Sequence, residues 1–172
     1  MEQGERKQWR SSGQCGMCRA VFPKAAMTRH IAACGGRTAG SKGSRRGRVF
    51  HLVVEGRHAP SYWLHLQAPV GATLDVLDHV LRTTWLECCG HLSAFTIEGR
   101  GYTSDEVDSD EDQSMDVPLG EVLRAGTKFR YEYDFGTTTE LALRVVAERD
   151  GEIGRDPIGL LARNEPPPIA CQ

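Results

Sequence analysis

The sequence has no long hydrophobic run, and no stretch of it approaches the roughly 18 consecutive apolar residues that a transmembrane helix requires. Residues 1–7 also lack the apolar segment of a secretory signal. Three catalytic signatures are missing as well: Gly-x-Ser-x-Gly, His-Glu-x-x-His and the glycine-rich phosphate-binding loop. We therefore expect a cytoplasmic protein without a membrane partner, and we find no familiar catalytic motif.

The net charge is also small, at −2, but this value conceals two halves of opposite sign. Residues 1–48 contain eleven Lys and Arg against two Glu, whereas residues 49–172 contain ten against twenty-one Asp and Glu. A basic arm beside an acidic body suggests an anionic partner for the arm, such as nucleic acid. Two other interpretations stay open: the arm contacts nothing and only improves solubility, or it folds back onto the acidic body.

Six cysteines are present. In a reducing compartment, cysteines are more often metal ligands or buried thiols than members of disulfides. Four candidate ligands follow the pattern C-x2-C-x11-H-x3-C: Cys15, Cys18, His30 and Cys34. The first two would come from a turn, and the last two lie four apart on one side of a predicted helix. Three thiolates and an imidazole suit tetrahedral zinc, and a segment this small needs the metal to fold.

The arrangement resembles the ββα zinc-finger family. It differs in having a cysteine as fourth ligand, and the spacer between Cys18 and His30 is one residue shorter than the usual twelve. We predict one structural zinc ion there, and the alternative is an arm without metal. The base-reading positions of such a finger fall on Pro23, Ala26 and Arg29, of which only Arg29 can make a bidentate base contact. A single finger is too small for specificity alone. Nonspecific phosphate contacts stay open for Arg37, Lys42, Arg45, Arg46 and Arg48.

Composition divides the chain into segments. Residues 1–34 hold the predicted finger, and the Gly-, Ser- and Arg-rich residues 35–48 are expected to form a flexible basic linker. Residues 49–164 have the pattern of a packed α+β domain with two helices, and residues 165–172 form a proline-rich tail. The predicted strands span 49–55, 62–67, 92–97, 128–134, 138–147 and 158–161, and the predicted helices follow Thr73 and Asp116, the second being capped by Gly126.

Two further patterns allow a structural and a functional interpretation. Four aromatic residues, Phe129, Tyr131, Tyr133 and Phe135, alternate onto one face of a predicted strand, where core packing is favoured over an exposed row for stacking bases. The segment 104–116 holds seven carboxylates, for which we favour a solvated acidic loop over a calcium site, because the calcium-loop glycine and terminal glutamate are missing.

Three stretches of the body resemble, in order, the plasmid pRiA4b ORF-3-like family. They are residues 73–95, with a Trp followed by a His-Leu-x-x-Phe strand, residues 117–123, and residues 129–136, with Tyr-x-Tyr-Asp-Phe-Gly. The resemblance covers about residues 49–164 and implies a compact α+β domain with a curved, mostly antiparallel sheet. It implies little about activity, since the family is uncharacterised and is named partly for its occurrence on mobile elements. Some relatives flank the domain with cysteine pairs, which would make Cys171 the first ligand of a partial second zinc site.

We expect a zinc-binding, non-catalytic adaptor with a protein partner. One alternative is a nucleic-acid-associated accessory factor, linked to mobile elements, that binds through the basic arm. Another is an enzyme of unknown type that uses His91 and the acidic loop, although no coherent set of acid, base and nucleophile is visible. The neighbouring Cys88 and Cys89 are expected to be structural.

Overall fold

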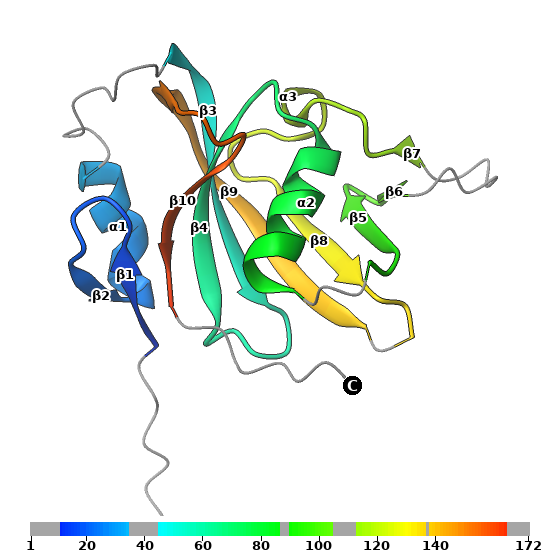
Figure 1. Ribbon diagram of the computed structural model, residues 1–172, viewed down its shortest axis with the longest axis horizontal. Coiled ribbons are helices and arrows are strands. Elements are labelled where there is room, and N and C mark those ends of the chain that lie inside the picture. Colours follow the sequence, from blue (N-terminus) through cyan, green and yellow to red (C-terminus); the bar gives the residue numbers. More distant parts are fainter. Residues whose placement is uncertain (1–10, 35–44, 87–89, 105–112, 137, 165–172) are drawn as a thin grey trace, which may run out of the picture.

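The computed structural model describes residues 11–34, 45–86, 90–104, 113–136 and 138–164, which form ten strands and three helices (Figure 1). The strands are β1 Ser12–Cys15, β2 Val21–Pro23, β3 Arg45–Gly56, β4 Trp63–Pro69, β5 Ser93–Ile97, β6 Arg100–Thr103, β7 Gln113–Ser114, β8 Lys128–Tyr133, β9 Thr139–Ile153 and β10 Gly159–Arg163, and the helices are α1 Lys24–Cys34, α2 Leu74–Trp85 and α3 Leu119–Val122.

All ten strands belong to one open sheet in the order β2-β1-β10-β4-β3-β9-β8-β5-β6-β7. Every neighbouring pair is antiparallel except β6 and β7, which are parallel. The expected mostly antiparallel sheet is therefore confirmed. The long strands β3 and β9 form its centre, so they set the twist that the shorter strands follow.

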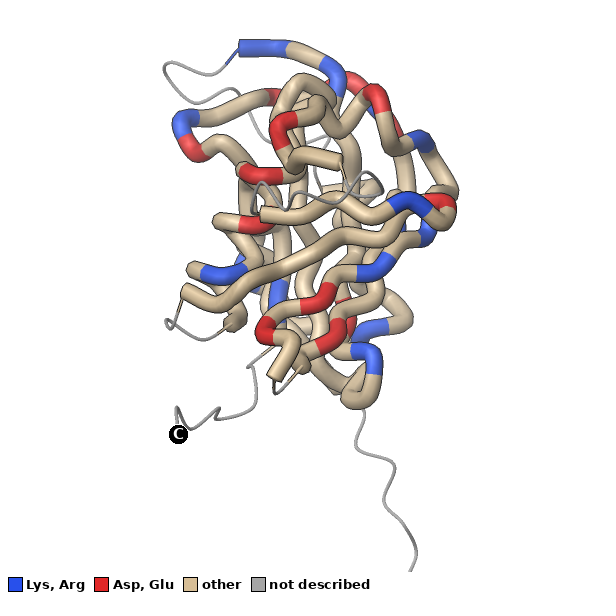
Figure 2. The backbone as a smooth tube through the Cα atoms, turned by 90° about the vertical axis from the view of Figure 1, so that its right-hand side faces the viewer, with Lys and Arg blue, Asp and Glu red and all other residues tan. Residues whose placement is uncertain are grey.

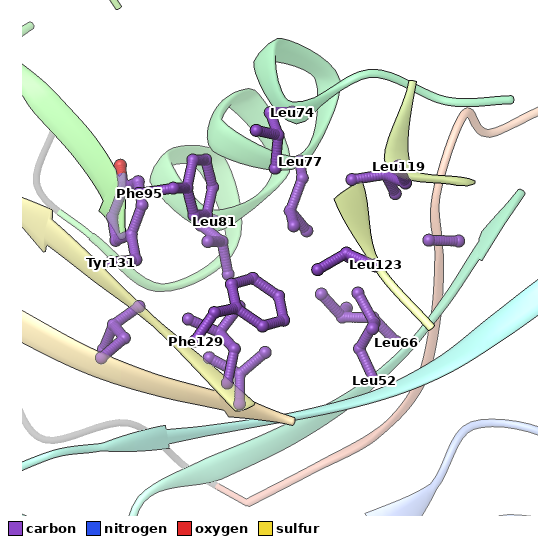
Figure 3. Close-up of a cluster of buried hydrophobic side chains, with 14 of the residues drawn as sticks. Leu52, Leu66, Leu74, Leu77, Leu81, Phe95, Leu119, Leu123, Phe129 and Tyr131 are labelled. Atoms are coloured by element: carbon purple, nitrogen blue, oxygen red, sulfur yellow. The ribbon is translucent and has the colours of Figure 1, made fainter. Parts of the chain in front are cut away.

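One face of this sheet carries the main core, and α2 lies against it (Figures 1 and 3). Because side chains alternate along a strand, Leu52 and Leu66 point toward the helix while their chain neighbours point to the opposite face. The helix supplies Leu74, Leu77 and Leu81, which are fully buried. This apolar stripe at helical spacing fixes both the position of α2 and the identity of the sheet's inner face.

Local signals in the sequence determine several element boundaries. The Oγ1 of Thr73 accepts a hydrogen bond from the Val76 N–H at 3.3 Å, which caps α2 as expected. Glu98 and Gly99 both have positive φ, at 49° and 83°, which is the geometry of a tight two-residue hairpin turn between β5 and β6. Asp134 has a φ of 57°, and its Oδ1 accepts the Gly136 N–H at 2.9 Å, so this part of the Asp-Phe-Gly stretch is a turn.

The structure also corrects four details of the sequence analysis. Residues 45–48 belong to β3, where they pair with β9, so they are strand rather than flexible linker. Phe135 is 54% exposed, unlike the other three aromatic residues of its row, because the turn at Asp134 ends the alternation. Gly126 lies in the turn before β8, with a φ of 90°, and does not cap α3. The strands β6 and β7 are missing from the predicted strands.

Candidate metal centre

Four metal-binding side chains of the N-terminal segment converge on one point. Cys15 ends β1, Cys18 lies in the turn that follows it, and His30 and Cys34 lie one helical turn apart on α1. Their ligand atoms all lie within 4.8 Å of one another. The Sγ of Cys18 and the Nε2 of His30 are 3.3 Å apart. The structure thus brings together the four residues that the sequence predicts as ligands.

The backbone around the turn explains how two cysteines three residues apart can face one site. The Cys15 N–H donates to the Ala20 carbonyl at 2.9 Å, and the Arg19 N–H donates to the Cys15 carbonyl at 2.9 Å. Arg19 has a φ of 63°, a left-handed conformation that closes the turn. The ring of Phe22 stacks on His30 with centroids 4.0 Å apart and an interplanar angle of 25°, which fixes the orientation of the imidazole.

The thiols of this cluster affect one another's protonation. The backbone N–H of Ala20 lowers the pKa of Cys18, because it stabilises the thiolate. Desolvation raises the pKa of Cys34 to about 11, and the sulfurs of Cys18 and Cys15 add to this effect. Neighbouring thiolates repel one another, so their joint ionisation needs a cation between them.

The donor set fits zinc. Ligand atoms around tetrahedral zinc lie about 3.5–3.8 Å apart when Zn–S is about 2.3 Å and Zn–N about 2.0 Å, a spacing compatible with a cluster of this size. Three sulfurs and one nitrogen are soft or borderline donors, which favours zinc over calcium or magnesium. With four protein ligands no coordination position stays open for substrate, which is typical of structural zinc sites.

The ligand-bearing segment packs against the body. β1 pairs with β10, where Cys15 lies opposite Ala162, and the Gly16 N–H donates to the Leu161 carbonyl at 2.7 Å. A second apolar cluster is shared between the two parts, and its buried members are Cys15, Met27, Ile31, Trp63, Leu161 and Ala162. The strands β1 and β2 therefore extend the sheet beyond β10, with α1 beside them (Figure 1), and Cys15 belongs both to the metal-ligand cluster and to this shared core.

A polar contact at the same junction joins the two ends of the described chain. The Oγ of Ser11 accepts hydrogen bonds from Trp63 Nε1 and Asn164 Nδ2, both at 2.8 Å. Lys24, the first residue of α1, pairs with Glu55 of β3 at 3.0 Å. These contacts satisfy polar groups around the buried indole and add directional bonds to the apolar packing.

Four of the six candidate nucleic-acid-binding residues lie in the described part of the chain: Arg29, Arg45, Arg46 and Arg48. Arg29 is exposed on α1, and Arg45 and Arg46 are exposed in β3. Arg48 pairs with Glu148 of β9 at 2.6 Å, so an acidic neighbour already neutralises it. In Figure 2, basic and acidic positions are interspersed over the described chain. Arg37, Lys42 and Cys171 lie outside the described residues, as do Cys88, Cys89 and residues 105–112.

A buried polar network under α2 was not predicted from the sequence. Asp78, only 6% exposed, accepts hydrogen bonds from Tyr131 Oη and Ser93 Oγ, both at 2.6 Å, and from Arg82 Nε at 2.7 Å. Burial raises the pKa of Tyr131, and the Asp78 carboxylate adds to this rise. Burial opposes the charged form of Arg82, but the carboxylate outweighs it and raises the pKa of Arg82. The spacing of Asp78 and Arg82, four residues apart on a predicted helix, was the sequence signal from which this ion pair could have been predicted.

A pair of histidines is buried on the opposite sheet face. His51 Nε2 and His65 Nδ1 are 2.8 Å apart, and both residues are at most 3% exposed. Burial lowers the pKa of His51 to about 4 and that of His65 to about 3, with nearby Arg144 adding to both shifts. Both imidazoles are therefore neutral at pH 7, and one ring donates its N–H to the other.

His91, the residue of the enzyme alternative, is exposed near the end of α2. Its Nδ1 lies 3.9 Å from Asp134 Oδ1, and its ring contacts Tyr133 edge-on at 5.9 Å. No helix in the described ranges combines the length and hydropathy needed to cross a membrane.

The chain belongs to the plasmid pRiA4b ORF-3-like protein family, whose sequence profile matches residues 49–171. The match covers the α+β body and confirms the resemblance carried by the Trp, His-Leu-x-x-Phe and Tyr-x-Tyr-Asp-Phe-Gly positions. The metal-ligand cluster at residues 15–34 lies before the matched region. No curated protein matches the chain.

A solved structure shares the fold. It is a protein of unknown function, MM3350, from Methanosarcina mazei Go1, with a TM-score of 0.55 and 17% sequence identity. The similarity covers 67% of each chain. At this identity the likeness concerns the fold alone.

Proposed function

We propose that this member of the plasmid pRiA4b ORF-3-like family is a zinc-binding, non-catalytic interaction protein. One structural zinc ion would be bound by Cys15, Cys18, His30 and Cys34 and would hold the segment β1–β2–α1 against the edge of the body. The observation that carries this proposal is the convergence of the four ligand atoms within 4.8 Å.

A structural role for the metal is supported by the composition of the ligand set and by its surroundings. Four protein ligands complete a tetrahedron, so water and substrate have no place on the ion. Cys15 is fully buried in the core shared with Trp63, which places one ligand inside the packing between segment and body. Loss of zinc would therefore release the segment from the sheet.

An interaction role is supported by what the segment leaves exposed. The outer edge of the sheet is the short strand β2, where Val21 is 64% exposed. The outward side of α1 includes the exposed Arg29, while Met27 and Ile31 are buried on the other side. This surface of edge strand and helix would receive a protein partner, and zinc would keep it rigid.

Metal analysis of the full chain tests the proposal. Native mass spectrometry with elemental analysis should find one zinc per chain. The variant Cys18→Ser should lose it, whereas Cys89→Ser, a cysteine outside the cluster, should keep it. A chelator should expose Trp63, 1% exposed in the structure, and shift its fluorescence to longer wavelength. A chain that contains no metal and keeps the same fluorescence with and without chelator would contradict the proposal.

A second candidate function is nonspecific binding to nucleic acid through the basic arm. It is favoured by Arg29, Arg45 and Arg46, which are exposed and have no ion pair within the described residues. Binding of random duplex and single strands should then weaken steeply with salt. The triple variant of these arginines to glutamine should reduce the salt slope, and absence of binding at low salt would eliminate this function.

A further inference from the structure

A groove of about 540 Å³ lies on the sheet face opposite α2. It crosses β3, β9, β8 and β5. Its outward-facing residues alternate with core residues: Phe129 and Leu143 point to the helix side, and Lys128 and Arg144 point into the groove. None of the four metal-ligand residues lines the groove, so ligand binding in the groove does not depend on zinc.

Three cations from two neighbouring strands line this groove. Lys128 of β8 lies directly opposite Arg144 of β9, and Arg130 lies two residues along β8 on the same face. All three side chains are exposed. None of the ion pairs found in the described part of the chain involves them. Like charges directly opposite each other destabilise a sheet, so the position favours a bound anion.

The two acidic residues of the groove do not neutralise these cations, because each has another partner. Glu55 pairs with Lys24 at 3.0 Å, and Glu98 pairs with Arg124. Both carboxylates line the groove together with the three cations. A long polyanion following the groove would meet these carboxylates, whereas a compact anion can bind among the three cations.

A second basic groove, of about 560 Å³, is less suited to an anion. It is lined by Arg45, Arg48 and Arg155, but Asp156 lies in the same lining and Arg48 is paired with Glu148. The excess of unpaired positive charge is therefore larger in the groove across β8 and β9.

The floor of the favoured groove selects against stacking ligands and for a small aliphatic or sugar-like moiety. Ala142 supplies apolar surface and Thr96 a hydroxyl, since both are half-buried, whereas Val53 and Phe129 are buried, each being 4% exposed. Single-stranded nucleic acids are bound through exposed aromatic rings, which this lining lacks. The groove volume lies in the range of small-molecule sites.

We propose that this groove binds a phosphorylated small molecule, with the phosphoryl oxygens on Lys128, Arg130 and Arg144 and the remainder on Ala142 and Thr96. Guanidinium groups present paired N–H donors that match phosphate oxygens, and the lysine adds a point charge. The two strands hold the cations in place before the ligand arrives, which reduces the ordering cost of binding.

Titration of the full chain with inorganic pyrophosphate tests this site, because the probe carries the shared phosphoryl chemistry alone. Calorimetry at low ionic strength should show saturable binding, and amide NMR shifts should concentrate on β8 and β9. The double variant Arg130→Gln/Arg144→Gln should weaken binding at least tenfold. The control Arg163→Gln, an exposed arginine on β10, should bind as the native chain does.

Three results would overturn the proposal. They are no saturable binding of pyrophosphate, equal weakening in the control variant, and tighter binding of a random single strand or of a polyglutamate peptide than of pyrophosphate. The last result would identify a macromolecular polyanion as the occupant. Because the altered side chains are exposed and Arg144→Gln removes a like-charge pair, the variants should unfold at no lower urea concentration than the native chain, which separates loss of binding from loss of fold.

Discussion

Replacing Ile31 with alanine should loosen the contact between α1 and the sheet without removing a metal ligand. Ile31 is 1% exposed and belongs to the cluster that α1 shares with Trp63. The change deletes three carbon groups, worth about 2.4 kcal/mol at roughly 0.8 kcal/mol each. A residual cavity of about 40 Å³ adds roughly 1 kcal/mol. The packing should therefore weaken by about 3 kcal/mol.

Amide hydrogen exchange at Gly16 reports this loss, because its N–H donates to the Leu161 carbonyl across the junction at 2.7 Å. A loss of about 3 kcal/mol should speed exchange at this amide roughly a hundredfold, since about 1.4 kcal/mol corresponds to a factor of ten. Zinc content should stay unchanged. The control Arg29→Ala alters an exposed residue of the same helix and should leave the exchange rate unaltered. Equal exchange in Ile31→Ala, Arg29→Ala and the native chain would refute the packing of α1 on the body.

Other perturbations test separate parts of the molecule. Asp78→Asn should lower the free energy of unfolding, measured by urea denaturation, by about 1–3 kcal/mol, because the change disrupts hydrogen bonds to a buried carboxylate. The control Asp75→Asn, at an exposed position of the same helix, should have little effect. The pKa values of His51 and His65, about 4 and 3, lie below the ordinary 6.5, so the unfolded chain takes up more protons in acid. Stability from this pair should be complete above pH 6.5 and fall between pH 6.5 and about 3; replacing both with glutamine should flatten this slope in denaturation measurements. Gly13→Val should displace β1, because a Cβ there would lie 2.5 Å from the buried indole of β4; nuclear Overhauser contacts between β1 and β10 should vanish, and their survival would count against the register.

The sequence predicts the convergence of the four potential metal ligands because the constraint on them is local. Cys15 and Cys18 share one turn, and His30 and Cys34 share one helical face, so spacing alone indicates a common site. Most strands of the body and both of its helices were predicted for the same reason, since alternation and helical spacing are visible over a few residues. The capping of α2 by Thr73 is likewise a local signal.

Contacts between distant residues could not be predicted in the same way. The pairing of β1 with β10 joins residues near opposite ends of the sequence, as does the bond between Ser11 and Asn164, which are 153 residues apart. No local pattern encodes such a partner. The groove across β8 and β9 could not be predicted for the same reason, because Lys128 and Arg144 come together only through the register of these two strands. The zinc ion itself stays a prediction from the donor set.

The pairing of β1 with β10 has a consequence for the order of events during protein synthesis. Cys15, Cys18 and Cys34 emerge from the ribosome long before residues 159–163, the strand with which β1 pairs. With the proposed zinc site, a nascent chain would bind metal while the surface that receives the N-terminal segment is still untranslated. The N-terminal segment can pair with the sheet only after β10 is made. A chain that terminated before residue 159 would therefore lack the strand with which β1 pairs.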